Sequence, residues 1–417
     1  MLNKINIFLF SILPVSLITG NLLINLNIIL INLSMLYFSL KYNDWSWLKN
    51  KLFKILIIFN FYIISNSIYN YLIDNTVGVD GIYRSLGFLK FVLLTFSFSV
   101  LIKDISSFEK IVKTWFFIIS IVIFDVFFEF SFGHNIFGFK SLDNTRIISF
   151  FYDESVVGGF LLTFSFVICA YFLNKNFKDE KKIFINIFLF IIPLCILVTG
   201  ERSNFLKCLI LFFLFMIFID SKQLIISKIK ISIILLIGIF VAINLNQKLF
   251  IKQTEFFKRV LIIENAKNFT ERFQNIKYFA HYDAALKIFK DHPLNGVGSK
   301  NFRKKCSDEK YFNENLKNSQ FRCSTHPHQI HFEILSEHGV LGYLLFLYII
   351  IFFIYNNLKR CFPNKNIFTY STNFYLIVFL IPILPGGGVF SSFNGALFWI
   401  IFALANYQQK FLKSKKI

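Results

Sequence analysis

Stretches of about 20 predominantly apolar residues recur along most of this 417-residue chain, and they restrict its folding more than any other feature. A helix of roughly 20 apolar residues crosses the hydrocarbon core of a bilayer, because it satisfies its backbone hydrogen bonds within its own segment. Hydrophobic residues make up 55% of the chain and the mean hydropathy is +0.60, too apolar for a soluble protein. We therefore predict an all-α polytopic membrane protein with about twelve transmembrane helices.

Twelve apolar stretches are the predicted spans. They cover residues 5–20, 22–40, 52–72, 85–102, 112–132, 155–173, 183–199, 204–219, 230–246, 333–355, 373–389 and 393–408. The first has the length of a signal peptide, but no small-x-small cleavage site follows it, so we interpret it as the first helix. One large loop separates the ninth and tenth spans. The predicted parts are therefore nine helices in residues 1–246, a loop subdomain in 247–329, and three helices with a tail in 330–417.

The net charge of +20 comes from basic residues between the spans. They gather in alternate connections near residues 41–51, 103–110, 175–182, 222–228 and 359–365, and at both termini. This asymmetry is typical of cytoplasmic loops, so we expect a multi-pass protein of the bacterial inner membrane with both termini cytoplasmic, surrounded by membrane lipids. Nucleic acid is not an expected partner. The large loop is then periplasmic, since long translocated loops escape the charge rule.

Two cysteines share that loop, Cys306 and Cys323. An oxidising compartment favours a disulfide, which would close a loop of roughly 17 residues and stabilise it by about 3 kcal/mol. The alternative is a pair of unpaired thiols.

A helix is predicted from Thr270 to Lys290, because apolar residues recur on one side of it. Asp291-His292-Pro293 ends it, and Leu294 to Gly298 must form a tight turn. Gly296 and Gly298 would permit close approach of the backbone to a ligand.

The segment from Thr325 to Gln329 leads into the tenth span. Pro327 suits the first turn of a helix capped by Thr325 or His326, which would put His328 in that turn. There the helix dipole attracts anions and favours neutral imidazole, the form that a general base needs. A simpler interpretation is that His326, His328 and His331 only cap or solvate the helix end. His328 and His331 could also share a metal, but no carboxylate or thiol completes a ligand set, so we expect none.

Three arginines lie on the predicted outer face, where basic residues are otherwise few: Arg146, Arg202 and Arg272. A planar guanidinium is a natural partner for a diphosphate at the membrane surface. Each arginine alone could instead be an interfacial anchor.

Two motifs carry a resemblance to a known family. They are His292-Pro293-Leu294-Asn295-Gly296-Val297-Gly298, and His328-Gln329 followed by nine residues and Gly339-Val340-Leu341-Gly342. With the general layout, they resemble the O-antigen ligase and polymerase superfamily, membrane glycosyltransferases of lipopolysaccharide and surface polysaccharide biosynthesis.

The resemblance implies an inverting sugar transfer on a GT-C-like fold, in the periplasm, from an undecaprenyl-diphosphate-linked glycan. No nucleotide sugar, cofactor or catalytic metal is expected. His328 would deprotonate or orient the acceptor hydroxyl, with Gln329, His331, Gly296 and Gly298 in support. Arg202 and Arg272, with Arg146, would hold the diphosphate, while Gly339 and Gly342 would let the tenth helix pack closely on a neighbour.

The acceptor distinguishes the two activities in this superfamily, lipid A-core for a ligase and a glycan repeat unit for a polymerase. An R-x10-G pattern of some polymerases is missing at Arg202 and Arg272, which favours the ligase. A transporter would need ionisable groups at mid-bilayer and helix breaks in matching halves, and its candidates, Asp125 and the break at Pro385, do not correspond. A non-catalytic scaffold would tolerate the loss of His328.

Overall fold

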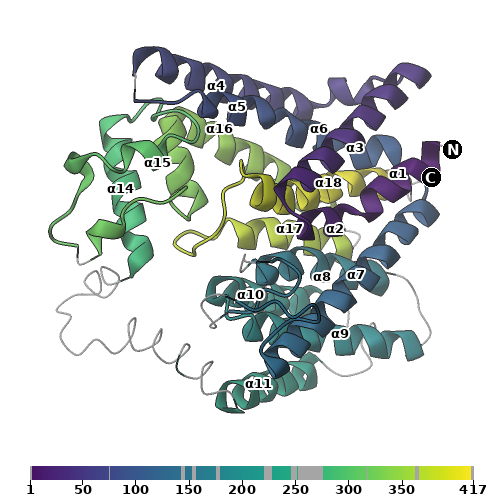
Figure 1. Cartoon of the computed structure of the whole chain (residues 1–417). Coiled ribbons are helices and arrows are strands. Elements are labelled where there is room, and N and C mark those ends of the chain that lie inside the picture. The colour runs from purple at the N-terminus through teal and green to yellow at the C-terminus, as the bar shows by residue number, and fades with distance from the viewer. Residues whose placement is uncertain are drawn as a thin grey trace.

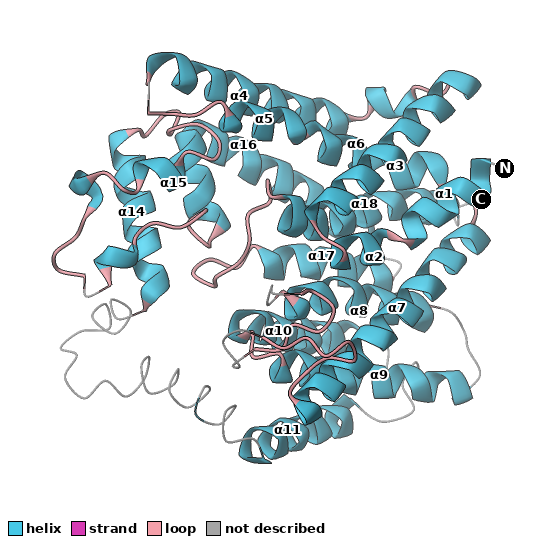
Figure 2. Ribbon diagram, in the orientation of Figure 1, coloured by secondary structure: helices cyan, strands magenta, loops and turns pink. Residues whose placement is uncertain are grey.

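The structure is a computed structural model that describes residues 2–74, 76–141, 146–152, 156–174, 179–219, 228–245, 251, 276–316, 318–361 and 366–414. These residues form α-helices and short 3-10 helices joined by loops (Figures 1 and 2). The first part contains α1 (Leu2–Ser11), α2 (Leu13–Ile18), α3 (Asn21–Tyr42), η1 (Ser46–Lys49), α4 (Lys51–Ile73), α5 (Asp80–Gly87), α6 (Leu89–Leu101), α7 (Ile105–Phe132), α8 (Val157–Leu173), α9 (Asp179–Val198), α10 (Arg202–Phe218) and α11 (Lys228–Leu245). The remainder contains α14 (Lys277–Asp291), α15 (Phe302–Lys305), η3 (Glu309–Tyr311), η4 (Ser319–Phe321), α16 (Ile330–Cys361), α17 (Ile367–Phe379) and α18 (Ser392–Ser414).

The helices are those of a multi-pass membrane protein. Five helical stretches are long and apolar enough to cross a bilayer, namely α3, α4, α5 with α6, α7 and α16, and shorter apolar helices accompany them. The all-helical, polytopic class predicted from the sequence is thus confirmed. Helix is present in each of the twelve predicted spans, although the first is divided between α1 and α2 and the fourth between α5 and α6. The bounds predicted for the eleventh span, 373–389, are wrong, because α17 ends at Phe379 and a loop follows it. The number of membrane crossings and their direction stay predictions.

The N- and C-termini lie together at one end of the bundle, and α14 and α15 lie at the other (Figure 1). Between these ends the helices pack through aromatic side chains. Trp115 and Trp399 are fully buried, and the Trp115 ring meets Phe98 and Phe164 edge-on. Large rings bury much apolar surface, which explains how a phenylalanine-rich chain fills the interior of this bundle.

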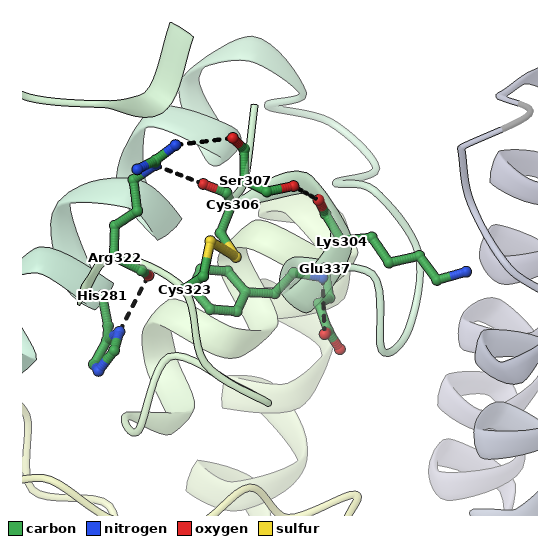
Figure 3. Close-up of a disulfide and its surroundings, with 8 residues drawn as sticks. His281, Lys304, Cys306, Ser307, Arg322, Cys323 and Glu337 are labelled. Carbon is green, nitrogen blue, oxygen red and sulfur yellow. Dashed lines mark hydrogen bonds between the residues drawn. A yellow bond between two sulfur atoms is a disulfide. The ribbon is translucent and has the colours of Figure 1, made fainter. Parts of the chain in front are cut away.

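Residues 276–316 and 318–329 form a small unit with its own apolar cluster. Its buried members are Ala284, Ala285, Ile288, Val297, Phe302, Cys306 and Tyr311. A disulfide joins Cys306 to Cys323 (Figure 3). The neighbouring Arg322 side chain links the same two segments, because it donates hydrogen bonds to the carbonyl oxygens of Cys306 and Ser307, both at 2.8 Å. The helix predicted from Thr270 ends at Asp291, as expected from Pro293, but its first residues fall outside the described part of the chain.

Candidate functional site

The segment around His328 starts α16 differently from the prediction. The helix begins at Ile330, so Pro327 and His328 precede it, and the prediction that they form its first turn is wrong. The side-chain oxygen of Gln329 accepts hydrogen bonds from the backbone N–H groups of His331 at 2.7 Å and Phe332 at 3.2 Å. Gln329 therefore fills the capping position that we expected Thr325 or His326 to fill.

His328 itself has a left-handed backbone, with φ of 56°. A residue with a branched or ringed side chain reaches this region at a cost of about 1–3 kcal/mol, and such residues gather at functional sites. Nε2 of the ring lies 2.9 Å from the Ser324 hydroxyl. Other aromatic rings surround it, with centroid distances of 4.3 Å to His326, 5.2 Å to His281 and 5.4 Å to Tyr278.

This environment keeps the imidazole of His328 neutral. Burial lowers its pKa to about 3, and the neighbouring His326 and His281 add to the effect. The expected neutral form is thus present, but burial causes it, because His328 lies outside the helix whose dipole was invoked. In the described residues no group of three or more His, Cys, Asp or Glu side chains is arranged to hold a metal ion.

The loop before α18 connects His328 with the start of α10. The Gly386 N–H donates to the carbonyl oxygen of His328 at 2.7 Å. The preceding residue, Pro385, accepts hydrogen bonds at its carbonyl oxygen from the Ser203 hydroxyl and from Nζ of Lys207 at 3.1 Å. Two consecutive loop residues therefore hold the segment of His328 and the first turn of α10, which begins at Arg202.

The other two predicted arginines have different outcomes. Arg146 is exposed, and its charge acts on Glu201, the buried residue that precedes Arg202. Burial raises the pKa of Glu201, while hydrogen bonds from the Gly158 N–H and the Asn204 side chain, both at 2.6 Å, oppose that rise. Arg146 thus lies near the start of α10. Arg272 lies outside the described residues.

The two sequence motifs meet in space at a break in α16. Gly339 has φ of 62° and ψ of −168°, a combination that essentially only glycine adopts, and it interrupts the helix. Backbone groups freed by the break pair with the turn after α14. Those bonds run from Val297 N–H to Ser336 O (3.0 Å), Gly298 N–H to Glu337 O (2.8 Å), Val340 N–H to Pro293 O (2.8 Å) and Leu341 N–H to Leu294 O (3.3 Å). The motifs together thus satisfy backbone groups that a broken apolar helix would leave unpaired.

These contacts revise the predicted roles of three glycines. A Cβ on Gly339 would lie 2.2 Å from the Leu294 carbonyl oxygen, and one on Gly296 would lie 2.4 Å from the Glu337 backbone. Gly296 thus allows the turn to approach α16, whereas we had predicted that it would allow approach to a ligand. Gly339 packs on the turn, whereas we had predicted that it would pack on a neighbouring helix. Gly298 has φ of 82° and donates to Glu337 as above. Gly342 does face another helix, since its Cβ would lie 2.9 Å from the Tyr62 ring of α4.

Comparison with known families agrees with these motifs. Residues 187–347 match the O-antigen ligase family. The predicted resemblance is therefore confirmed for this segment, which covers less than half of the chain. It includes the start of α10, the disulfide-containing unit, His328 and the break in α16. Membrane glycan transfer of the ligase or polymerase type is the activity of this family. A search among curated proteins found no match.

Within the matched segment, His331 has a hydrogen-bond partner at both ring nitrogens. Its Nε2 lies 2.8 Å from the Leu380 carbonyl oxygen, just after α17, and its Nδ1 lies 3.1 Å from the Tyr343 hydroxyl. These bonds give His331 a part in fixing α16 against the end of α17.

A buried ion pair was missed by the sequence reasoning. Nη2 of Arg84 lies 2.5 Å from Glu333 and Nη1 lies 3.7 Å from Glu337, and both carboxylates are fully buried. The two glutamates are four residues apart on α16, so they share one face of that helix. Arg84 directly precedes the fourth predicted span on the predicted outer face, where basic residues are few, and this position could have identified it.

Proposed function

We propose that this protein transfers a glycan from an undecaprenyl-diphosphate donor to an acceptor hydroxyl, with inversion, at the periplasmic face of the bacterial inner membrane. The acceptor proposed first is lipid A-core, which makes the protein an O-antigen ligase. The observation that carries the proposal is the O-antigen ligase match across a segment in which the start of α10 and His328 are held by the same loop. The proposed topology has twelve spans on a GT-C-like fold.

The chemistry requires a base and an anion-binding group. The acceptor oxygen attacks the anomeric carbon, the bond from that carbon to the donor phosphate oxygen breaks, and undecaprenyl diphosphate leaves with the negative charge. His328 takes the proton of the acceptor hydroxyl in this scheme, because a neutral imidazole has one unprotonated nitrogen that can accept it. In this scheme Nε2–H donates to the Ser324 hydroxyl, and Nδ1 is the nitrogen that takes the proton.

Arg202 and Arg146 are proposed to hold the diphosphate with Arg272. The proximity of Arg146 to the start of α10 supports the first two. Fixed guanidinium groups would stabilise charge as it develops on the leaving group without reorganising, which is commonly the largest contribution to catalysis.

Reconstituted transfer from an undecaprenyl-diphosphate glycan tests the proposal. His328→Ala is expected to lower the rate at least 100-fold, the range for loss of a general base. The matched control, His134→Ala, removes an exposed histidine from another loop and should keep the wild-type rate. Wild-type rates in His328→Ala would overturn the role of His328 as the base, whereas no transfer by the wild type would favour a non-catalytic scaffold. Lipid A-core and a glycan repeat unit, offered separately as acceptors, distinguish the ligase from the polymerase.

The transporter alternative has less support. Asp125, its candidate ionisable group in the fifth predicted span, accepts hydrogen bonds from the Ile136 N–H at 2.8 Å and from the Ser149 hydroxyl at 2.5 Å. These bonds fasten the following loop to α7, so they give Asp125 a structural task.

A further inference from the structure

A cavity of about 620 Å³ opens next to the loop of His328. We call it the basic pocket. It lies between α5, the starts of α3, α6, α15 and α18, and the loop residues Lys300, Thr325, His326 and Gly388. Its charged lining consists of Arg84, Lys90, Lys300 and Arg303 against Asp80. The volume is within the range of about 300–1,000 Å³ of small-molecule sites, so a sugar with a substituent would fit.

The positive charge of the basic pocket is only partly neutralised. Asp80 lies 3.5 Å from Lys300, and Arg84 faces the two glutamates of α16. Lys90 donates instead to the amide oxygen of Asn25 at 2.7 Å, and Arg303 donates to the Thr325 carbonyl oxygen at 3.1 Å. Across the described ranges, no carboxylate lies within 4.0 Å of the Lys90 or Arg303 charge. Such cations in a concave site attract an anion.

The basic pocket lies next to His328, the proposed base, on a different side from α10. His326 lines it, and the His326 ring lies 4.3 Å from that of His328. The loop before α18 contacts α10 at Pro385 and lines the pocket from Gly388 onward. Inverting displacement needs the acceptor on the face of the anomeric carbon opposite the leaving group. With the donor diphosphate near α10, the basic pocket lies where an acceptor can approach.

We propose that the basic pocket binds an anionic substituent, a phosphate or a carboxylate, of the acceptor glycan, with Lys90 and Arg303 as its main contacts. The site thereby selects acidic acceptors over neutral ones. Assignment of the ligand to the acceptor rests on the proposed function, whereas anion binding by the pocket does not.

Binding to the full-length protein tests the anion site without any transfer. In phosphatidylcholine nanodiscs, glucose 6-phosphate should bind and glucose should not, as measured by calorimetry. The double variant Lys90→Gln/Arg303→Gln should weaken binding at least tenfold, while Lys290→Gln, which removes an exposed charge outside the pocket, should leave it unchanged. Equal binding by wild type and double variant, or no binding by wild type, overturns the proposal. So does loss of binding in phosphatidylglycerol nanodiscs, which would assign the pocket to a lipid headgroup.

Kinetics with matched phosphorylated and dephosphorylated acceptors test the assignment to the acceptor. The double variant should raise KM for the phosphorylated acceptor at least tenfold and leave both kcat and KM for the donor within twofold. A rise in KM for the donor would instead assign the pocket to the donor diphosphate and overturn the proposal. Melting followed by circular dichroism checks that the variant folds. If glucose 6-phosphate binds but no transfer occurs with any donor, the proposed function fails and the anion site stands.

Discussion

The hydroxyl of Ser324 lies 2.9 Å from Nε2 of His328, and Ser324 directly follows the disulfide residue Cys323. A hydroxyl–imidazole bond fixes the ring about its χ angles, as the partners of catalytic histidines commonly do. The disulfide-containing unit thus contacts His328, the proposed base, through the side chain of Ser324.

Ser324→Ala should therefore lower kcat about tenfold, equivalent to about 1.4 kcal/mol, and leave KM for the acceptor nearly unchanged. The loss arises because the ring can turn away from its productive orientation. Steady-state transfer rates measure it, with Ser307→Ala as a control in the same unit, where the hydroxyl bonds only to the Lys304 carbonyl oxygen among described residues. A lower KM for the acceptor in Ser324→Ala would mean that this serine competes with the acceptor.

The pH profile of kcat/KM should not show the decrease near pH 6.5 that protonation of an ordinary histidine causes. Because the pKa of His328 lies at about 3, kcat/KM should stay level from about pH 8 to pH 5 instead of falling near 6.5. A fall centred near 6.5 that disappears in His328→Gln would contradict the assignment.

Stability should depend on the same proton. The unfolded chain protonates this histidine near pH 6.5 and the folded chain does so only near pH 3, so the unfolded state binds more protons between these values. The free energy of unfolding should decrease as pH falls through that interval, and His328→Gln should reduce the slope. The slope from one group is limited to about 1.4 kcal/mol per pH unit. Denaturant unfolding at several pH values measures it.

Gly339→Ala should destabilise the protein by more than the cost of a positive φ alone. Its Cβ would lie 2.2 Å from the Leu294 carbonyl oxygen and would force the turn away from α16. Gly138→Ala is the matched control, since Gly138 has φ of 84° but open space around its Cβ, so its cost should be about 1–2 kcal/mol. Equal melting temperatures of the two variants would show that the contact between turn and helix adds nothing.

Removal of the disulfide should loosen the unit that holds Ser324. In Cys306→Ser/Cys323→Ser, the free energy of unfolding should fall by about 3 kcal/mol and amide exchange in residues 306–323 should accelerate. Transfer should slow as well, because the partner of His328 is less well fixed. Dithiothreitol should reproduce this effect in the wild type and do nothing further to the variant.

The helices followed from sequence because apolar stretches of membrane length leave few alternatives. The end of α14 at Asp291 followed from Pro293, a local signal. The start of α16 did not, since a cap by the long side chain of Gln329 competes with the more usual Ser, Thr, Asp or Asn. His328 was identified by its motif, but the partner of its carbonyl oxygen, the N–H of Gly386, is more than 50 residues away in the sequence.

The partners of Arg84 and of the break at Gly339 could not be predicted either, because they are distant in the sequence. Glu333 and Arg84 are separated by 249 positions, and nothing local to either indicates the other. The turn after α14 and the break in α16 can each be recognised in the sequence as a glycine motif. The hydrogen bonds between them form only in the folded chain, so the sequence did not predict their pairing.

The joint between that turn and α16 is made of main-chain groups on both sides. Its strength therefore depends on few side chains, namely the glycines that let the two backbones meet and Asn66 of α4, whose amide donates to the carbonyl oxygens of Asn295 and Glu337. The unit that contains α14 and the disulfide could accordingly change much of its sequence without remaking the span, whereas the basic pocket draws Arg303 from this unit and Lys90 from the bundle.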